Sequence, residues 1–488
     1  MAKFGIKADH FVASALFLKN NVLVAELKKV LKLTQKFPII SNQTRYQLAL
    51  CHHFVDQNTT ALEIIQKLDP LQNSAQVALL WLDILLECQD FDTFDTLYNA
   101  LSDKTPNNPE LQIRKATQLY TLGQHDASQN LLDTINGTDE TNAKRDRLQA
   151  RVYFFQGRLD DAAAISVNFL NDPDADLDHY YLHYYILLGA GNIEQAMALL
   201  RRRPRPSHPR SLRDKPSAYD IGPLAGKTIY ISPEQGIGDR VEYARFFQRA
   251  AKMDIRLKAR QPKHLTRLLK SMTAAPEHAA QKPKAKNIDS AVRIGDLPAL
   301  LNITAKEELR AEPYLIPELK YVARWKKRID KHKPVIGIAW KGSDLGWLDF
   351  NRSIPLKALH PILKRTDITV VCLQIGAALA DVDDLPVEHR PIVFPDLDKG
   401  KDAYVDTVGL IANLDLVVTS DTSMAHVAGA MGAPSVVLLG KYPDLRWLQD
   451  PRPDFLYKNQ NLIRQNEFGD WDTVIEKLSD FIDKKFTL

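Results

Sequence analysis

The stretch LDLVVTSDTSMAHVAGAMGAPSVVLLG, residues 414–440, holds the clearest strand–turn–helix–strand pattern in the chain. The run LDLVVT is short, apolar and β-branched, which is typical of a strand buried on both faces. The polar residues Ser420, Asp421, Thr422 and Ser423 follow it, and their side-chain oxygens favour the start of a helix. Small alanine and glycine residues then allow that helix to pack closely on a sheet before the second apolar run, PSVVLLG. The pattern predicts two parallel strands joined by a helix.

Apolar runs of the same kind recur between Gly226 and Gly440, and most are separated by helical patterns. Strands that alternate with helices imply parallel βαβ units, so we expect two doubly wound, Rossmann-like lobes. The division between the lobes falls near Lys331, where the charged segment RWKKRIDKHK precedes PVIGIAW. The expected strands are KTIYIS, DIRLKA, AVRIG, PVIGIAW, ITVVCLQ, RPIVF, LDLVVTS and PSVVLLG.

The N-terminal part of the chain shows no convincing strand and contains a repeat instead. Gly123, Gly157 and Gly191 are 34 residues apart, and each lies between two helical patterns. This period resembles the tetratricopeptide repeat (TPR), in which paired helices pack closely where side chains are small. We therefore expect a TPR-like α-solenoid over residues 1–205 and a proline- and arginine-rich linker over 206–226. Small residues also recur five positions after each glycine, at Ser128, Ala162 and Ala196.

The bulk composition is that of a soluble globular protein, with 45% hydrophobic and 25% charged residues. A net charge of +4 on 488 residues does not indicate nucleic-acid binding. The cysteines Cys51, Cys88 and Cys372 are far apart, and we expect free thiols in a reducing compartment. Neither a signal peptide nor the roughly 20 consecutive apolar residues of a membrane span is visible, so we expect a cytoplasmic protein.

Three loops follow predicted strands at their C-terminal ends, where α/β sheets bind ligands. The first is SPEQGIGD, in which Gly236 and Gly238 let the backbone turn tightly and approach a ligand. A carboxylate in this loop can serve as a general base toward an acceptor hydroxyl, and Asp239 and Glu234 are the candidates. The alternative is that Asp239 only caps the following helix.

The second and third loops suit a phosphate group. Lys341 follows the strand PVIGIAW, with Arg352 a little further on, and such cations neutralise a diphosphate or a leaving phosphate. In the third loop, the hydroxyls of residues 420–423, the free N–H groups and the helix dipole form a site for a phosphate-bearing donor, with His426 one turn into the helix. The alternative, a purely structural turn, uses one capping residue rather than three.

A series of motifs between Lys227 and Val474 resembles bacterial GT-B glycosyltransferases that carry tetratricopeptide repeats. These enzymes in turn resemble heptosyltransferases and, more distantly, O-GlcNAc transferases. The resemblance implies an acceptor-side lobe over 227–333, a nucleotide-sugar-binding lobe over 334–460 and a C-terminal helical segment over 461–488. The motifs are SPEQGIGDRVEYARFF, NRSIPL, VVCLQIG, SDTSMAHVAGAMGAPSVVLLG, PDLRWL and LIRQNEFGDWDTV.

The resemblance also assigns roles to individual residues. It makes Asp239 the general base, with Glu234 as the runner-up, and it links Lys341 to the donor phosphates. The full set of residues that we expect to bind the donor is Gly236, Gly238, Lys341, Arg352, Gln374, Ser420, Asp421, Thr422, Ser423 and His426. Many relatives have W-x-G-N-P where this chain has WKGSDLGW, which leaves the identity of the donor open.

The same resemblance implies an inverting enzyme without a metal cofactor. No Asp-x-Asp follows a predicted strand, and we expect the DVDD segment at 381–384 to be a surface loop. The leading hypothesis is transfer from a nucleotide sugar, with CMP-nonulosonate a candidate, to serine or threonine of a protein such as flagellin held by the repeat arm. A second hypothesis is a transferase of surface polysaccharide or lipopolysaccharide assembly. A third, of another class, is a repeat scaffold without catalysis.

Overall fold

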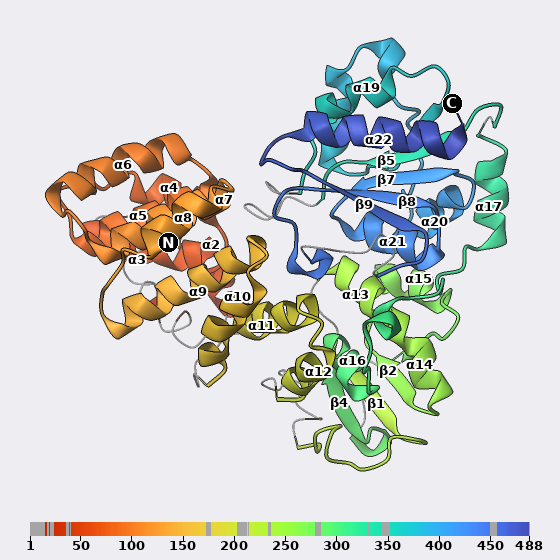
Figure 1. The fold of residues 1–488 in the computed structure, drawn as a ribbon, viewed down its shortest axis with the longest axis horizontal. Helices are drawn as coiled ribbons and strands as arrows, with labels where there is room; N and C mark the ends of the chain where they lie inside the picture. Colours follow the sequence, from red (N-terminus) through yellow and green to blue (C-terminus); the bar gives the residue numbers. More distant parts are fainter. Residues whose placement is uncertain are drawn as a thin grey trace, which may run out of the picture. The chain divides into compact units, whose positions relative to one another are not determined.

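The computed structural model divides the chain into two compact units, Met1–Val152 and Tyr153–Leu488 (Figure 1). The candidate base Glu234 and the segment 343–351 lie outside the residues that the structure describes. The described residues are 15–16, 19, 24–35, 39, 41–171, 177–202, 212, 214–232, 236–278, 285–329, 331–342, 352–448 and 456–487.

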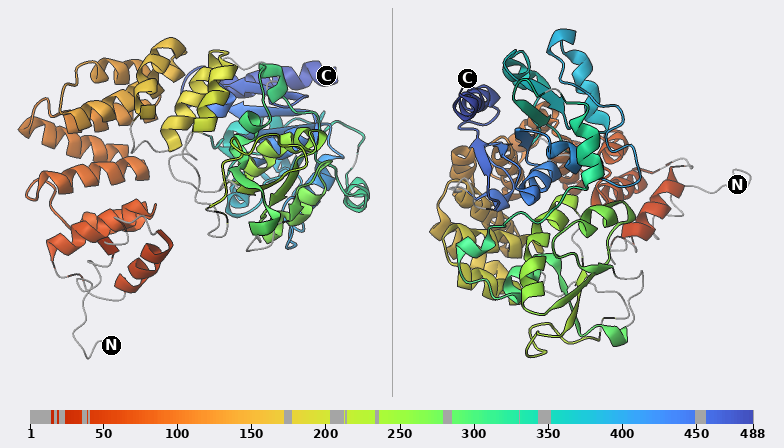
Figure 2. Two further views of the ribbon diagram at one scale, coloured as in Figure 1. Left: turned by 90° about the horizontal axis from the view of Figure 1, so that it is seen from below. Right: turned by 90° about the vertical axis from the view of Figure 1, so that its right-hand side faces the viewer.

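The first unit consists of successive helix pairs, which lie side by side in Figure 2. The 34-residue period is visible in the elements themselves, because α5 begins at Ala75 and α7 at Pro109. Gly123 and Gly157 have φ values of +72° and +76°, the left-handed conformation that ends a helix and that glycine adopts without strain. The helices are α2 (Val24–Thr34), α3 (Asn42–Phe54), α4 (Asn58–Ile65), α5 (Ala75–Cys88), α6 (Phe91–Lys104), α7 (Pro109–Thr121), α8 (His125–Leu132) and α9 (Asp139–Phe155).

Small side chains and ion pairs hold neighbouring repeats together. Ser128 is fully buried and its Oγ donates to the carbonyl of Ala116 at 2.8 Å, so these small residues do allow two helices to pack closely. Arg114 of α7 pairs with Asp83 of α5 at 2.7 Å, and Glu110 of α7 pairs with Lys144 of α9 at 3.3 Å. Each pair joins the first helices of adjacent repeats, which is the nearest-neighbour contact of a solenoid.

The second unit begins with the last helices of the repeat region and continues into two parallel sheets. The contact-based division therefore falls at Val152, inside the region that the sequence assigns to the repeat arm. Helix α12 packs on the short helix α16 (Leu297–Leu300), and Arg201 of α12 donates to the carbonyl of Ala299 at 3.3 Å. The repeat helices of this unit are α10 (Leu159–Ser166), α11 (Leu177–Gly189) and α12 (Ile193–Arg202).

Both sheets are parallel, which confirms the expected pair of doubly wound lobes. The first has the order β3-β2-β1-β4 and the second has the order β6-β5-β7-β8-β9. The first contains β1 (Thr228–Ser232), β2 (Arg256–Ala259), β3 (Glu277–His278) and β4 (Ser290–Arg293). The second contains β5 (Val335–Ala339), β6 (Thr369–Cys372), β7 (Leu416–Ser420), β8 (Ser435–Leu439) and β9 (Gln460–Arg464).

Three local expectations differ from the structure. RPIVF forms only an isolated bridge, in which Ile392 donates to the carbonyl of Val370 at 2.8 Å and accepts from the N–H of Cys372 at 2.9 Å. The segment expected to be helical from residue 461 begins within β9, and its helix, α22, spans Trp471–Phe486. The DVDD segment lies at the surface as expected, with the Asp383 side chain 81% exposed, but it ends the 3-10 helix η10 (Ala377–Asp384), and Asp381 accepts from the indole Nε1 of Trp340 at 2.8 Å.

The core of the second lobe lies between one face of its sheet and α22 (Figure 1). Alternate residues of β5, β7 and β8 are buried on this face, and apolar residues one turn apart on α22 cover them. Helix α21 (Ser423–Met431) connects β7 to β8 and packs on both strands, and α20 (Val405–Ile411), which precedes β7, packs on α21 and on α17 (Leu319–Lys326). The core residues include Ile336, Ile338, Leu416, Val418, Val436, Leu438, Val474, Ile475, Leu478 and Ile482.

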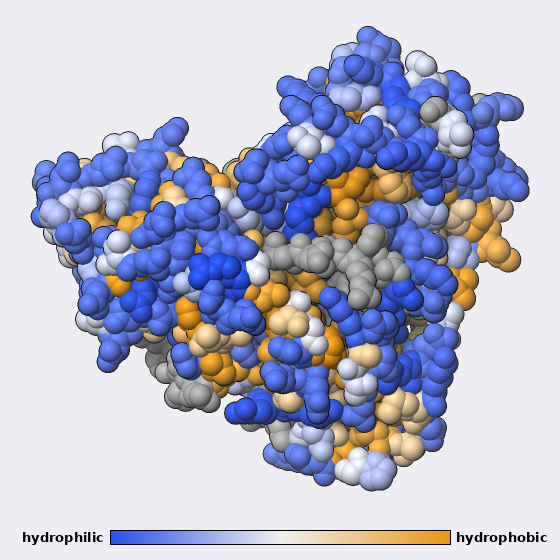
Figure 3. Space-filling model, in the orientation of Figure 1, coloured by the Kyte–Doolittle hydropathy of each residue, from blue (hydrophilic) through white to orange (hydrophobic). Residues whose placement is uncertain are grey.

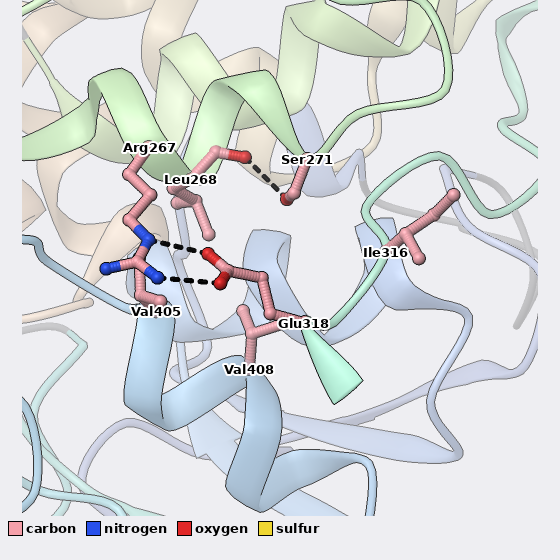
Figure 4. A pocket seen from close by; sticks show the side chains of 7 residues that line it. All are labelled: Arg267, Leu268, Ser271, Ile316, Glu318, Val405 and Val408. Carbon is pink, nitrogen blue, oxygen red and sulfur yellow. Dashed lines mark hydrogen bonds and ion pairs between the residues drawn. The ribbon is translucent and has the colours of Figure 1, made fainter. Parts of the chain in front are cut away.

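A connecting segment, residues 311–318, binds both lobes through its backbone. Tyr314 and Leu315 donate to the carbonyl of Ala430 in α21, at 2.8 and 3.0 Å, and Ile316 donates to the carbonyl of Ser271 in the first lobe at 3.2 Å. Figure 4 shows the small depression beside this segment, where Arg267 forms a two-bonded ion pair with Glu318, 2.6 Å in each bond. These bonds attach the connecting segment to the first lobe at Ser271 and to the second lobe at Ala430, near the end of α21.

No helix in the described ranges is both long and apolar enough to cross a membrane. Much of the surface visible in Figure 3 is hydrophilic, and apolar residues form separate patches on it. The large apolar side chains that are most exposed are Leu319, at 83%, and Val387, at 75%.

Candidate active site

Helices from the two lobes meet at the ends of two predicted ligand-binding loops. Helix α13 (Ile237–Tyr243) follows β1 of the first lobe, and α21 follows β7 of the second. At Gly238 an added Cβ would lie 3.1 Å from Cδ2 of His426 and 3.6 Å from Cα of Ser423. A larger residue at 238 would push the helices apart, so the glycine permits this approach. The first and third loops therefore lie together.

The turn between β7 and α21 presents the polar groups expected from its sequence. Thr422 is the N-cap, and its hydroxyl accepts from the N–H of Met424 at 3.3 Å. The hydroxyl of Ser423 contacts that of Tyr404 at 2.5 Å. Ser420 is fully buried, and its Oγ has no hydrogen-bond partner among the described residues. Burial and the neighbouring Asp444 carboxylate raise the pKa of Asp421. The turn thus places a buried hydroxyl at a strand end, beside the first turn of α21.

The second loop lies at the adjacent strand end, because β5 pairs with β7. The side chain of Gln374 holds this end of the chain, since its Oε1 accepts from the N–H groups of Trp340 at 3.1 Å and Lys341 at 3.0 Å. Its Nε2 donates to the carbonyl of Lys341 at 2.9 Å. The guanidinium of Arg352 lies over Gly342, where an added Cβ would be 2.9 Å from Nη2, and its charge acts to lower the pKa of Asp421. Gln374 therefore orients a strand end that carries two cations.

His426 lies inside the contact between the lobes and is only 2% exposed. Its Nδ1 is 3.0 Å from the hydroxyl of Tyr457, and its ring stacks on that of Trp447 with centroids 5.7 Å apart. Its Nε2 is 4.0 Å from Oε2 of Glu242. Burial lowers the pKa of His426 to about 4, although the Glu242 carboxylate opposes the shift. The imidazole is thus neutral near pH 7 and supports the start of α21 from within.

Arg446 joins the lobes through a set of carboxylates that no sequence pattern predicts to lie together. Its Nη1 donates to Oδ1 of Asp239 at 2.8 Å and to Oε2 of Glu242 at 2.5 Å, both in α13. Its Nε donates to Oδ1 of Asp444 at 2.9 Å. Arg245 donates to the other oxygen of Glu242 at 3.0 Å. We call these five residues the interlobe ion cluster.

The charges of this cluster compensate one another around Glu242, whose side chain is buried. Burial alone would raise the pKa of Glu242, but the guanidinium groups of Arg446 and Arg245 outweigh it and lower the pKa. Asp239 is more accessible, with 26% of its side chain exposed. Gly236, and not Asp239, is the N-cap of α13, and an added Cβ there would lie 2.6 Å from Oδ2 of Asp239. Asp239 therefore lies in the first turn of α13 and is not its N-cap, and its role as the base stays a prediction.

The described residues include no group of three or more His, Cys, Asp or Glu side chains placed to hold a metal ion. The independence from metal that the resemblance implies stays a prediction.

Comparisons with known proteins support the interpretation of the second lobe. Residues 405–467, which run from α20 through β9, match the family model described as glycosyltransferase family 9 (heptosyltransferase). The chain is 25% identical over 280 residues to protein FlbA of Caulobacter vibrioides. That alignment covers 52% of this chain and 46% of FlbA, so the chain matches less than half of that relative's length.

Two solved structures are similar over different parts of the chain. Escherichia coli ADP-heptose LPS heptosyltransferase II aligns with 53% of this chain and 99% of its own, at 16% identity and a TM-score of 0.38. Thermobaculum terrenum O-GlcNAc transferase aligns with 98% of this chain and 94% of its own, at 11% identity and a TM-score of 0.31. Residues 405–467 of the second lobe are thus similar to glycosyltransferase family 9, and in the structure TPR-like helices precede two lobes with parallel sheets.

The buried, neutral His426 makes stability depend on pH. The pKa of His426 is about 4 in the folded protein and 6.5 in the unfolded reference. Its contribution to the free energy of unfolding is therefore fully present above pH 6.5 and is lost as the pH falls toward 4. In this window we expect the wild type to lose up to roughly 1.4 kcal/mol per pH unit more than His426→Gln. Urea unfolding of both proteins at several pH values measures the difference. A parallel loss of stability in the two proteins would contradict the assignment.

Proposed function

We propose that this protein transfers a sugar from a nucleotide-sugar donor to a serine or threonine hydroxyl of a protein acceptor. One observation carries the proposal. The capped, hydroxyl-rich start of α21, within the segment that matches glycosyltransferase family 9, lies against the α13 loop that carries Asp239. A phosphate-binding element of one lobe thus faces a carboxylate of the other, as transfer between two substrates requires.

The donor is assigned to the C-terminal ends of β5 and β7. The N–H groups and hydroxyls of residues 420–423 bind its phosphate, and Lys341 and Arg352 supply compensating charge. Gln374 and His426 support the site without contacting the donor. The side chain of Gln374 binds the backbone at the end of β5, and that of His426 binds Tyr457. Gly238 lets α13 approach α21, and Gly236 leaves room for the side chain of Asp239.

The reaction is assigned as a single displacement. The Asp239 carboxylate removes the proton of the acceptor hydroxyl, the oxygen attacks the anomeric carbon, and the bond from that carbon to the phosphate oxygen breaks. The nucleotide leaves with the electron pair of that bond, and the cations and helix N–H groups stabilise its charge. One displacement inverts the anomeric centre. Glu234 is the second candidate for the base.

Loss of the Lys341 charge is expected to weaken donor binding. A charge-assisted bond to phosphate contributes about 1.5–3 kcal/mol, so Lys341→Gln lowers the affinity roughly tenfold or more. Thermal shift with CMP-, UDP-, GDP- and ADP-sugars first identifies the donor class, because a bound ligand stabilises the fold, and calorimetry then compares the proteins. Lys364→Gln, an exposed lysine on the same lobe, is the control. Equal affinities for all three proteins would remove Lys341 from the site.

Asp239→Asn is expected to abolish transfer while donor affinity stays within about twofold of the wild type. A positioned carboxylate base contributes about 10²–10⁴-fold to the rate, and an amide cannot take the proton. The measurement is turnover by nucleotide release, together with the donor affinity and melting temperature of the same preparation. Near-normal turnover would eliminate Asp239 and transfer the role to Glu234.

The repeat helices support a polypeptide as the acceptor, because solenoids present extended surfaces that suit peptides. Flagellin is the candidate that the sequence resemblance suggests. The description of the matched family as heptosyltransferases favours a second candidate acceptor, a lipopolysaccharide saccharide. The two candidates differ in what they require of the first unit.

Removal of residues 1–152 separates these acceptors. Residues 153–488 form a compact unit of their own, so the shortened protein is expected to keep donor binding and to lose transfer to protein. Intact mass of candidate acceptors after incubation with each enzyme measures this. Undiminished transfer to a protein by the shortened enzyme would refute the role of the repeat arm. Undiminished transfer to a saccharide would favour the saccharide as the acceptor.

A further inference from the structure

The interlobe ion cluster connects Asp239 with the opposite lobe through one side chain. Arg446 leaves the segment after β8, and its Nη1 is shared between Asp239 at 2.8 Å and Glu242 at 2.5 Å. Its remaining nitrogens bind Asp444, the residue two positions earlier, at 2.9 and 3.2 Å. The planar guanidinium is thus fixed by Asp444 on one side and offers its other edge to α13.

We infer that Arg446 is a positioning residue for the reaction, which holds the Asp239 carboxylate from the donor lobe. This inference rests on the proposed function of Asp239 as the base. The bond to Oδ1 fixes the rotation of the carboxylate, while Oδ2 lies toward Gly236 at the loop. The base is therefore oriented relative to the lobe that binds the donor, and not only relative to its own helix.

The segment that carries Arg446 is itself held firmly. Trp447 stacks on His426, and Nη2 of Arg464 donates to the carbonyl of Leu448 at 2.5 Å. Leu448 has a φ of +48°, a conformation that costs energy in a leucine and persists only where the surroundings impose it. Such strain is common where a side chain must be aimed.

Repeat helices of the second unit pack on the same segment. Phe155, at the end of α9, contacts the ring of Tyr442 edge to face, with centroids 5.4 Å apart. Gly189, at the end of α11, has the side chain of Leu448 4.0 Å from the position of an added Cβ. The segment from Tyr442 to Leu448 is therefore packed against repeat helices as well as α21, which limits the positions that Arg446 can take.

A purely structural role for Arg446 predicts lower stability without a specific effect on the chemical step. A positioning role predicts that a change at Arg446 lowers turnover only while Asp239 is present to act as the base. Lysine keeps the charge but cannot bridge two carboxylates with a planar fork, so Arg446→Lys tests orientation more than charge. Arg245→Lys is the control, because the Arg245 side chain is also buried, 5% exposed against 17% for Arg446, and binds Glu242 but has no bond to Asp239.

The test measures turnover of five full-length proteins: wild type, Arg446→Lys, Arg245→Lys, Asp239→Asn and the double variant Asp239→Asn/Arg446→Lys. The probe is whichever of the CMP-, UDP-, GDP- or ADP-sugars most stabilises the wild type, and nucleotide release is scored beside donor affinity and melting temperature. We expect Arg446→Lys to lower kcat roughly 10- to 100-fold, the size of effect that a misplaced catalytic group causes, with donor affinity within about twofold. The double variant should be no slower than Asp239→Asn, and Arg245→Lys should keep kcat within about threefold.

The outcomes distinguish failure of the positioning role of Arg446 from failure of the base role of Asp239. Near-normal kcat in Arg446→Lys, or an equal loss of kcat in Arg245→Lys, overturns the positioning role. So does a further loss of turnover when Arg446→Lys is added to Asp239→Asn, since Arg446 would then act independently of Asp239. An active Asp239→Asn single variant instead removes the proposed base, and the positioning role with it.

Discussion

The close approach of α13 and α21 at Gly238 is the constraint on which the site depends. With no side chain at this position, the helices that start at two strand ends, one in each lobe, come into contact. Charged groups near this contact, which would be costly to bury alone, find partners across it. The interlobe ion cluster is a consequence of this contact. Its guanidinium groups compensate the buried carboxylate of Glu242 and pair with the more accessible Asp239 and Asp444.

The sequence predicted what local patterns determine. Alternating apolar runs and helical patterns indicated two parallel sheets, and the recurring glycines at Gly123 and Gly157 marked the ends of helices by their need for positive φ. The polar turn after β7 was also visible, because several successive residues that could cap a helix are unusual, although Thr422 alone is the N-cap. RPIVF was misread, since its composition is that of a strand although it pairs with β6 only at Ile392.

The interlobe ion cluster could not be found in the same way. Arg446 and Glu242 are 204 residues apart, and the motif PDLRWL carries no local signal that its arginine turns inward rather than toward solvent. Gln374 and His426 were recognised as site residues, yet the structure gives them supporting positions, because their polar atoms bind the protein itself. Sequence patterns located the loops; long-range packing decided which side chains in them face each other.

The division of the repeats between two compact units has a consequence for how this architecture can change in length. Within the second unit, α11 and α12 are committed to the lobes: Tyr185 of α11 lies 3.4 Å from the hydroxyl of Tyr243, and Arg201 of α12 binds the backbone at Ala299. The earlier repeats contact mainly their neighbours, as in other solenoids. Whole 34-residue modules can therefore be gained or lost by duplication ahead of Tyr153 while the lobe contacts stay intact, so the reach of the solenoid can evolve in fixed steps, independently of the chemistry.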